Sequence, residues 1–129
     1  MISAISRILV VDDEDDIREI VSASLEALGG HTVEPCESGN EAILKAAAFK
    51  PDIILLDVMM PGMDGPTTLG KLREIDGLQT TPVIFITAKA MPTEVDRYLS
   101  LGALGVITKP FNPMTICEEI EALWNAARP

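Results

Sequence analysis

Aromatic residues and cysteines are scarce in this sequence of 129 residues. Only 4% of the residues are aromatic whereas 47% are hydrophobic, so the core must be built mainly from aliphatic side chains. The two cysteines, Cys36 and Cys117, lie far apart and in no metal-binding spacing, which favours two reduced thiols over the alternative of a structural disulfide. No apolar run is long enough to span a membrane, and the first residues lack the features of a secretory signal. These absences predict a cytoplasmic protein with no membrane contact.

Positive charge is also in short supply. Ten Lys and Arg residues stand against twenty Asp and Glu, which gives a formal net charge of −10. Proteins bind nucleic acid by placing Lys and Arg on phosphates, so we expect no nucleic-acid partner. The length suits one hydrophobic core, and we expect residues 1–129 to form a single domain with no further domain attached.

The chain alternates between short aliphatic runs and amphipathic stretches. The runs have the length of strands and are bounded by turn residues, whereas the stretches carry apolar residues at spacings of three and four. The expected strands cover residues 8–11, 32–36, 53–57, 83–87 and 104–108. The expected helices are one that ends at Gly29-Gly30, one from Ser38 through Phe49, one from Pro66 to Ile75, one from Pro92 or Thr93 to Gly102, and one that begins at Pro113 with Asn112 as its N-cap.

The helix spacings also predict which side chains are buried. The first helix has a stripe made of Ile17, Ile20, Val21, Ser24, Leu25 and Leu28. In the fourth helix Val95 and Leu99 are expected to be buried, and in the last helix Ile116, Ile120 and Leu123. Glu14, Asp15 and Asp16 suit the positive end of a helix dipole and are given no role in a site. His31, the only histidine, precedes an exposed strand and has no evident partner.

Five strands that alternate with five helices predict an α/β fold with a doubly wound parallel sheet. Right-handed crossover connections place helices on both faces of such a sheet. Ligands of these folds bind outside the carboxyl ends of the strands, where the strand order reverses. Functional side chains are therefore expected at that edge.

Polar side chains stand at four of the expected strand ends. Asp12 and Asp13 follow the first strand, Asp57 ends the third, Thr87 ends the fourth and Lys109 follows the fifth. Because the strands are parallel, all five side chains must lie at one edge of the sheet. An unpaired buried carboxylate is strongly disfavoured, so Asp57, at the end of an otherwise apolar strand, is the expected reactive group.

Three carboxylates at one edge call for a cation. Two of them about 4 Å apart repel by about 4 kcal/mol at an effective dielectric near 20. Oxygen ligands without histidine or cysteine suit a hard ion, and Mg²⁺ or Mn²⁺ fits a small site that keeps several waters better than Ca²⁺ does. The acidic run is not an EF-hand, because Ile17 stands where that loop requires glycine.

A carboxylate beside a divalent cation and a lysine can attack phosphorus and form an aspartyl phosphate. The cation and Lys109 would neutralise the phosphoryl oxygens in the transition state. Thr87 could donate a hydrogen bond to the product.

Four motifs carry a resemblance to a known family. They are Val-Val-Asp12-Asp13, Leu-Leu-Asp57-Val-Met-Met-Pro-Gly-Met-Asp-Gly, Ile-Thr87-Ala88 and Lys109-Pro110-Phe111. Together they resemble the receiver domain of two-component response regulators, over residues 7 to 127, in the form of a stand-alone, chemotaxis-regulator-like domain with no output domain.

The resemblance implies a flavodoxin-like fold with strand order 2-1-3-4-5 and a role in phosphorelay signalling. Asp57 would be the phosphoacceptor, and Asp12, Asp13, Asp57 and the backbone carbonyl of Met59 would surround Mg²⁺. Lys109 and Thr87 would bind the phosphoryl group, with a cis peptide bond between Lys109 and Pro110. The phosphodonor would be a histidine kinase or a histidine phosphotransfer protein. An output protein would bind the face formed by the fourth helix, the fifth strand and the fifth helix.

Two positions depart from the family pattern. Val106 stands where the family often has Tyr or Phe, so an aromatic switch cannot operate and the loop after the fourth strand, with Lys89 and Met91, is expected to carry the signal. Met59 stands two residues after Asp57, where the family influences hydrolysis. A thioether cannot orient an attacking water, which predicts a long-lived phosphoryl group.

Two other functions compete with this interpretation. A Mg²⁺-dependent phosphatase or phosphotransferase of the same fold usually has a second Asp two residues after its nucleophile, where this chain has Met59. A phosphorylation-dead interaction module would be expected to lack Asp57, Lys109 or one of the acid pair, and all are present. We therefore expect no enzymatic turnover beyond the protein's own phosphorylation and slow loss of phosphate.

Overall fold

The computed structural model describes residues 5–127, which form a five-stranded parallel sheet in the order β2-β1-β3-β4-β5. The elements along the chain are β1 Arg7–Val11, α1 Asp15–Gly29, β2 Thr32–Cys36, α2 Gly39–Phe49, β3 Ile53–Asp57, α3 Gly65–Leu72, β4 Val83–Thr87, α4 Pro92–Ser100, β5 Gly105–Thr108 and α5 Ile116–Ala126. The predicted α/β fold, its strand order and its five helices are confirmed.

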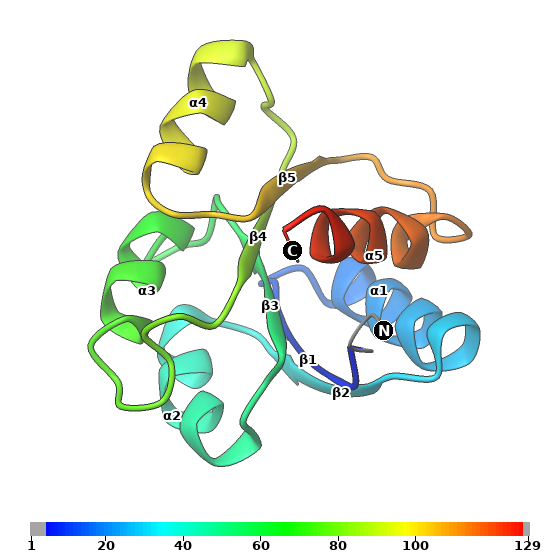
Figure 1. Ribbon diagram of the computed structural model, residues 1–129, viewed down its shortest axis with the longest axis horizontal. Helices are drawn as coiled ribbons and strands as arrows, with labels where there is room; N and C mark the ends of the chain where they lie inside the picture. The colour runs from blue at the N-terminus through cyan, green and yellow to red at the C-terminus, as the bar shows by residue number, and fades with distance from the viewer. Residues whose placement is uncertain (1–4, 128–129) are drawn as a thin grey trace.

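Helices cover both faces of the sheet. α1 and α5 lie on one face, and α2, α3 and α4 lie on the other (Figure 1). Each face has its own apolar core, one centred on Leu9, Leu56 and Phe85 and the other on Val10, Leu55 and Ile84. Because neighbouring residues of a strand point to opposite faces, the central strands must be apolar throughout, which is why they appear as continuous aliphatic runs in the sequence. None of the described helices has the length and apolar character needed to cross a membrane.

The sheet has an unusual outer strand. β2 pairs only with β1. On that side the Thr32 N–H donates to the Ser6 carbonyl, and the Cys36 carbonyl accepts from the Asp12 N–H. The alternate residues Val33 and Pro35 therefore turn their backbone groups outward. Proline has no N–H to offer, and an outer strand is one of the few places in a sheet that tolerates it.

Side-chain caps fix the starts of α2 and α3. The hydroxyl oxygen of Ser38 accepts a hydrogen bond from the Glu41 N–H, as expected for the start of α2. Asp64 caps α3 in the same way through the Thr67 N–H. α1 ends at Gly29, and its C-cap residue Gly30 has a φ of 68°, the left-handed conformation that glycine adopts without strain.

The predicted buried faces of α1 and α4 are wrong in part. Ile20 and Leu28 are exposed, so the buried stripe of α1 is narrower than its spacing suggests. Leu99 is 44% exposed, because the larger ring of Tyr98 takes the inward position on α4 and packs against Phe85 with ring centroids 5.1 Å apart.

The start of α5 and the setting of His31 also differ from expectation. α5 begins at Ile116, since Asn112 caps a preceding turn: its side-chain oxygen accepts from the Met114 N–H and its carbonyl from the Thr115 and Ile116 N–H groups. His31 is buried and has partners, because α5 packs over the turn that joins α1 to β2.

Candidate functional site

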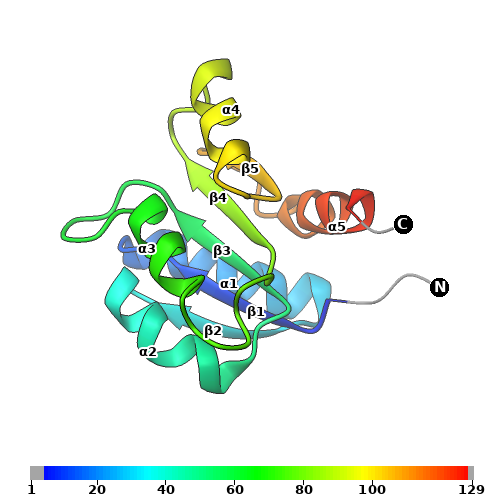
Figure 2. The same cartoon turned by 60° about the vertical axis from the view of Figure 1, so that its left-hand side comes forward.

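The carboxyl ends of the strands meet at one edge and carry the predicted polar residues. Figure 2 shows the arrowheads of β3 and β4 pointing to the same end of the sheet. Asp57 is the last residue of β3 and pairs in register with Ile86, and the next residue of β4 is Thr87. Asp12 directly follows β1, and its N–H donates to the carbonyl of Cys36 at the end of β2. Topology alone therefore brings these residues to the same edge.

Three carboxylates converge at this edge. Asp12, Asp13 and Asp57 each offer an oxygen, and these atoms all lie within 4.8 Å of one another. Asp12 is 2% exposed and Asp57 3%, whereas Asp13 is half-buried. Such a cluster of oxygen donors matches the ligand preference of a hard divalent cation. The predicted acid cluster is therefore present in the described chain.

Lys109 supplies the positive charge nearest to this cluster. Its Nζ lies 3.0 Å from Asp12 Oδ2 and 3.4 Å from Asp57 Oδ1. Its backbone N–H donates to the carbonyl of Thr87 at 2.8 Å, which ties the end of β5 to the end of β4. The Lys109-Pro110 peptide bond is cis, as the resemblance implied. One lysine cannot balance three carboxylates, so the cluster keeps an excess of negative charge.

That excess shows in the ionisation of the site. Burial, followed by the charge of Asp12, raises the pKa of Asp57 to about 7, although Lys109 acts in the opposite direction. Burial acts to lower the pKa of Lys109, but its hydrogen bond with Asp12 and the charges of Asp12 and Asp57 raise it overall. Lys109 is therefore a fixed cation near neutral pH, whereas Asp57 needs further positive charge to stay ionised.

The loop after β1 is held by contacts that the sequence did not reveal. The Glu14 N–H donates to Asp12 Oδ1 at 2.9 Å, and Arg18 Nη1 donates to the Asp12 carbonyl at 2.8 Å. Arg18 also forms an ion pair with Asp15. Glu14 Oε1 lies 3.9 Å from Lys109 Nζ, so Glu14 borders the site and is not only a helix-dipole residue. Only the acidic run itself hinted at these contacts.

Thr87 is buried at the end of β4, beside the cluster. Its hydroxyl oxygen accepts a hydrogen bond from the Lys89 N–H at 3.0 Å. The hydroxyl hydrogen is therefore left to donate to another acceptor. The contact also links this hydroxyl directly to the loop between β4 and α4.

The loop after Asp57 passes close to the next helix. The Gly65 N–H donates to the Val58 carbonyl at 2.8 Å, and a Cβ at Gly65 would lie 2.5 Å from the Asp57 carbonyl oxygen. Only glycine permits this approach, which holds the end of β3 against the start of α3. Met59, between them, has a side chain that is 66% exposed and carries no acid.

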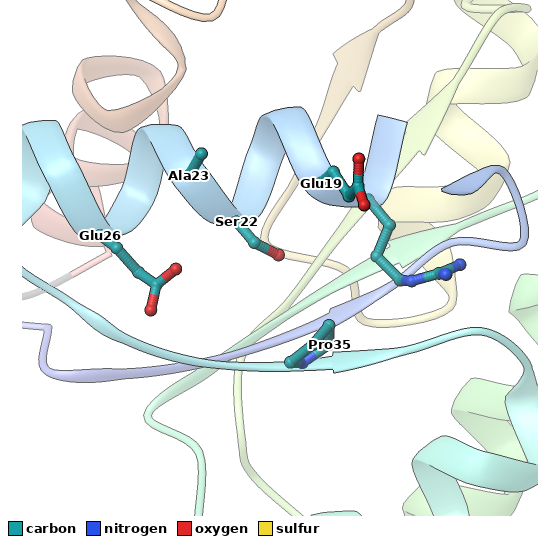
Figure 3. A pocket seen from close by; sticks show the side chains of 6 residues that line it. Glu19, Ser22, Ala23, Glu26 and Pro35 are labelled. Atoms are coloured by element: carbon teal, nitrogen blue, oxygen red, sulfur yellow. The ribbon is translucent and has the colours of Figure 1, made fainter. Parts of the chain in front are cut away.

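A groove of about 410 Å³ lies next to the site but does not include its acids. It is bordered by α1 and the outer strand β2, and Figure 3 shows Ser22 and Glu26 pointing from α1 toward Pro35. The lining residues are Arg18, Glu19, Ser22, Ala23, Glu26 and Pro35. Arg18 is the one lining residue that also contacts the loop of Asp12. The charged residues that line the groove are Arg18, Glu19 and Glu26, and the three clustered carboxylates of the sheet edge are not among them.

The parallel sheet, its strand order and the acid cluster at its carboxyl edge place this protein in the flavodoxin-like class of α/β domains. The model of the response regulator receiver domain family matches residues 8–121. The chain therefore belongs to the response regulator receiver domains, a family of signalling proteins, and the resemblance seen in the sequence is confirmed.

The curated relatives are longer than this chain. It is 37% identical over 122 residues to the transcriptional regulatory protein ResD of Bacillus subtilis (strain 168), covering 95% of this chain and 49% of ResD. It is also 37% identical over 123 residues to the phosphate regulon transcriptional regulatory protein PhoB of Escherichia coli (strain K12), covering 95% of this chain and 53% of PhoB. The chain thus spans about half the length of these two proteins.

Solved structures of similar size share the fold. The chemotaxis protein CheY4 of Vibrio cholerae superposes with a TM-score of 0.86 at 33% identity, over 93% of this chain and 99% of that one. The receiver domain of the Francisella response regulator 1452 superposes with a TM-score of 0.83 at 27% identity, over 95% of this chain and 99% of that one.

Proposed function

We propose that Asp57 is the phosphoacceptor of this receiver domain. The observation that carries the proposal is the setting of its carboxylate, which is 3% exposed, within 4.8 Å of two other acids and 3.4 Å from Lys109 Nζ. In the transfer, an Asp57 oxygen attacks phosphorus, an O–P bond forms, and the bond to the leaving group of the donor breaks.

Asp12, Asp13, Asp57 and the backbone carbonyl of Met59 are the residues that would hold Mg²⁺, or Mn²⁺ in its place. The donor set supports this assignment, since it consists of oxygens alone and carries more negative charge than Lys109 balances. A bound divalent cation supplies positive charge to the phosphoryl oxygens and keeps Asp57 ionised below its metal-free pKa of about 7.

Lys109 and Thr87 are assigned to the phosphoryl oxygens. Lys109 lies between Asp12 and Asp57, so its ammonium group can follow charge that moves from the carboxylate to the phosphoryl group. The Thr87 hydroxyl has a hydrogen to donate, because its oxygen already accepts from the Lys89 N–H. Both groups stabilise the product without forming a covalent bond to it.

The same Thr87 contact supports a route for the output signal. If the Thr87 side chain rotates toward a phosphoryl oxygen, its hydroxyl oxygen moves away from the Lys89 N–H, and residues 88–92 move with it. Val106 is half-buried against the core and offers no aromatic ring to swing. Backbone amide NMR shifts of residues 88–92 should change on adding beryllofluoride and Mg²⁺, while those of residues 76–80, at the other end of the sheet, should not. Unchanged shifts at 88–92 would rule out this route.

The partners follow from the family. Receiver domains work with histidine kinases or histidine phosphotransfer proteins, and we propose one of these as the phosphodonor. The proposed output surface is the face formed by α4, β5 and α5. Exposed Leu99 and Leu101, at the end of α4, give that face apolar contact area. The absence of an attached output domain stays a prediction.

Nothing in the site favours a phosphatase or phosphotransferase acting on small molecules. Such an enzyme needs a general acid to protonate its leaving group, and Met59 provides a thioether in that position. We propose that the chain catalyses only its own phosphoryl transfer and a slow loss of phosphate.

Intact-mass spectrometry tests the assignment of Asp57. The wild-type protein with acetyl phosphate and Mg²⁺ should gain the mass of one phosphoryl group, and Asp57→Ala should gain none. Asp96→Asn, which neutralises an exposed acid on α4, should behave like the wild type. A phosphorylated Asp57→Ala protein, or a wild type that is never modified, would refute the assignment.

A further inference from the structure

His31 joins three segments on the face of the sheet opposite α2, α3 and α4. Its backbone N–H donates to the Leu25 carbonyl at the end of α1. Its ring nitrogen Nδ1 lies 2.9 Å from the carbonyl oxygen of Ile5, just before β1. Its other ring nitrogen, Nε2, lies 3.5 Å from Glu121 Oε2 on α5. The side chain is only 6% exposed, so these contacts take place largely out of water.

The contacts fix where the ring protons are. A carbonyl oxygen can only accept, so the hydrogen bond to Ile5 requires a proton on Nδ1. In the neutral ring Nε2 is then a bare acceptor, and it faces the carboxylate of Glu121, which is also an acceptor. Nε2 is buried and has no hydrogen-bond partner among the described residues. A second proton on the ring turns this acceptor pair into a charge-assisted contact.

The surroundings leave Glu121 as the group that responds to this proton. From the α1 turn, Gly29 contacts the ring: a Cβ there would lie 2.5 Å from His31 Cδ2 and 3.1 Å from Cys117 Sγ on α5. The Cys117 thiol donates to the Ser24 carbonyl, and burial, then the charges of Glu121 and Glu118, raise its pKa, so it stays a neutral thiol. Within the described part of the chain, the segment just before β1 gives the ring one hydrogen-bond partner, the Ile5 carbonyl. Among residues 5–127, the only carboxylate within ion-pair distance of His31 is that of Glu121.

We propose that His31 is a proton-dependent clamp that fastens α5 to the start of β1 and the end of α1. With both ring nitrogens protonated, Nδ1 binds the Ile5 carbonyl while Nε2 attracts Glu121. When Nε2 loses its proton, the contact with α5 becomes repulsive and α5 is held less firmly. The clamp lies far from Asp57 in the chain and does not depend on phosphorylation. Because α5 belongs to the proposed output surface, the clamp makes the attachment of that surface depend on pH.

The sign of the effect follows from linkage. Because the contact between protonated Nε2 and Glu121 exists only in the folded protein, the stabilisation is present while the ring carries both protons and is lost as the pH rises. Glu121→Gln removes the carboxylate and supplies an amide N–H that can donate to neutral Nε2. This variant should therefore lose the clamp's pH dependence while it keeps the fold, since the Glu121 side chain is 49% exposed. Glu119→Gln makes the same charge change at an exposed position of α5 and serves as the matched control.

Thermal unfolding between pH 5.8 and pH 8.5 and NMR of the single histidine test the clamp together. On raising the pH, the Tm of wild type and of Glu119→Gln should fall by about 3 °C more than that of Glu121→Gln. The His31 ring signal should titrate at higher pH in the wild type than in Glu121→Gln. In a double-mutant cycle, His31→Asn, which can still donate to Ile5, should abolish the effect of Glu121→Gln on the pH dependence of Tm. Equal pH dependence of Tm in wild type and Glu121→Gln, or one common titration midpoint, would overturn the proposal.

Discussion

Replacing Asp57 by asparagine should make the metal-free protein more stable at pH 8. In the native state this carboxylate lies within 4.8 Å of the oxygens of Asp12 and Asp13, and each repulsion is about 3.5 kcal/mol at that distance with an effective dielectric of about 20. Lys109 Nζ, 3.4 Å away, returns about 5 kcal/mol of attraction. Together these interactions destabilise the folded protein with ionised Asp57 by about 2 kcal/mol, and burial of the charge destabilises it further.

The pKa of Asp57 gives the same sign and an upper limit. Its rise from 3.8 to about 7 corresponds to about 4 kcal/mol of lost stability for the ionised form. Because the folded state binds this proton more tightly than the unfolded chain, the cost is absent below about pH 4, grows as the pH rises to about 7 and is constant above it. Asp57→Asn should therefore exceed the wild type by about 2 to 4 kcal/mol at pH 8, and by little at pH 4.

Urea unfolding followed by circular dichroism measures this difference. The experiment is done with a chelator and again with excess Mg²⁺, which should stabilise the wild type by about 2.7 kcal/mol at a hundred times its dissociation constant and leave Asp57→Asn almost unchanged. Asp96→Asn controls for the change in net charge. A variant no more stable than the wild type at pH 8 would refute the electrostatic argument, and equal stabilisation of both proteins by Mg²⁺ would refute Asp57 as a ligand.

Three further substitutions test the packing and chemistry around the site. Gly65→Ala should lower the free energy of unfolding in urea by about 2 kcal/mol, because the new Cβ would lie 2.5 Å from the Asp57 carbonyl oxygen. Gly70→Ala, with open space around it, should be neutral or stabilising, and similar effects of the two substitutions would contradict the close approach at Gly65. Tyr98→Ala should cost about 3 kcal/mol by emptying the inner side of α4, and Tyr98→Phe much less; a cost under about 1 kcal/mol for alanine would show that α4 packs otherwise. Met59→Asn should shorten the life of the phosphoryl group about tenfold, the equivalent of one hydrogen bond to the attacking water, as followed by mass spectrometry after removal of acetyl phosphate; an unchanged lifetime would count against a role for Met59.

The sequence predicted the strands well because their environment leaves few alternatives. A strand buried on both faces must be apolar throughout, so residues 53–57 and 83–87 appear as runs with the same bounds as β3 and β4. The acids and the lysine then follow from topology, since parallel strands end at one edge. No side-chain geometry was needed to place Asp12, Asp57 and Lys109 near one another.

The buried faces of helices, and the contacts that support the site residues from behind, were harder to predict. Spacing identifies a stripe on a helix but not which of two adjacent apolar residues turns inward, as Tyr98 and Leu99 show. The support that Arg18 gives to the Asp12 carbonyl depends on the path of a loop. The burial of His31 depends on α5, which lies far away in the chain and packs over it.

The two outer strands of the sheet differ in what they offer to another chain. Pro35 removes an outward N–H from β2, so a further strand added beside it could form only a broken ladder of hydrogen bonds. β5 contains no proline and pairs on one side only, with β4. The sheet therefore grows poorly at β2, and strand addition, whether by a partner or by a second copy during aggregation, is directed to the side that α4 and α5 flank.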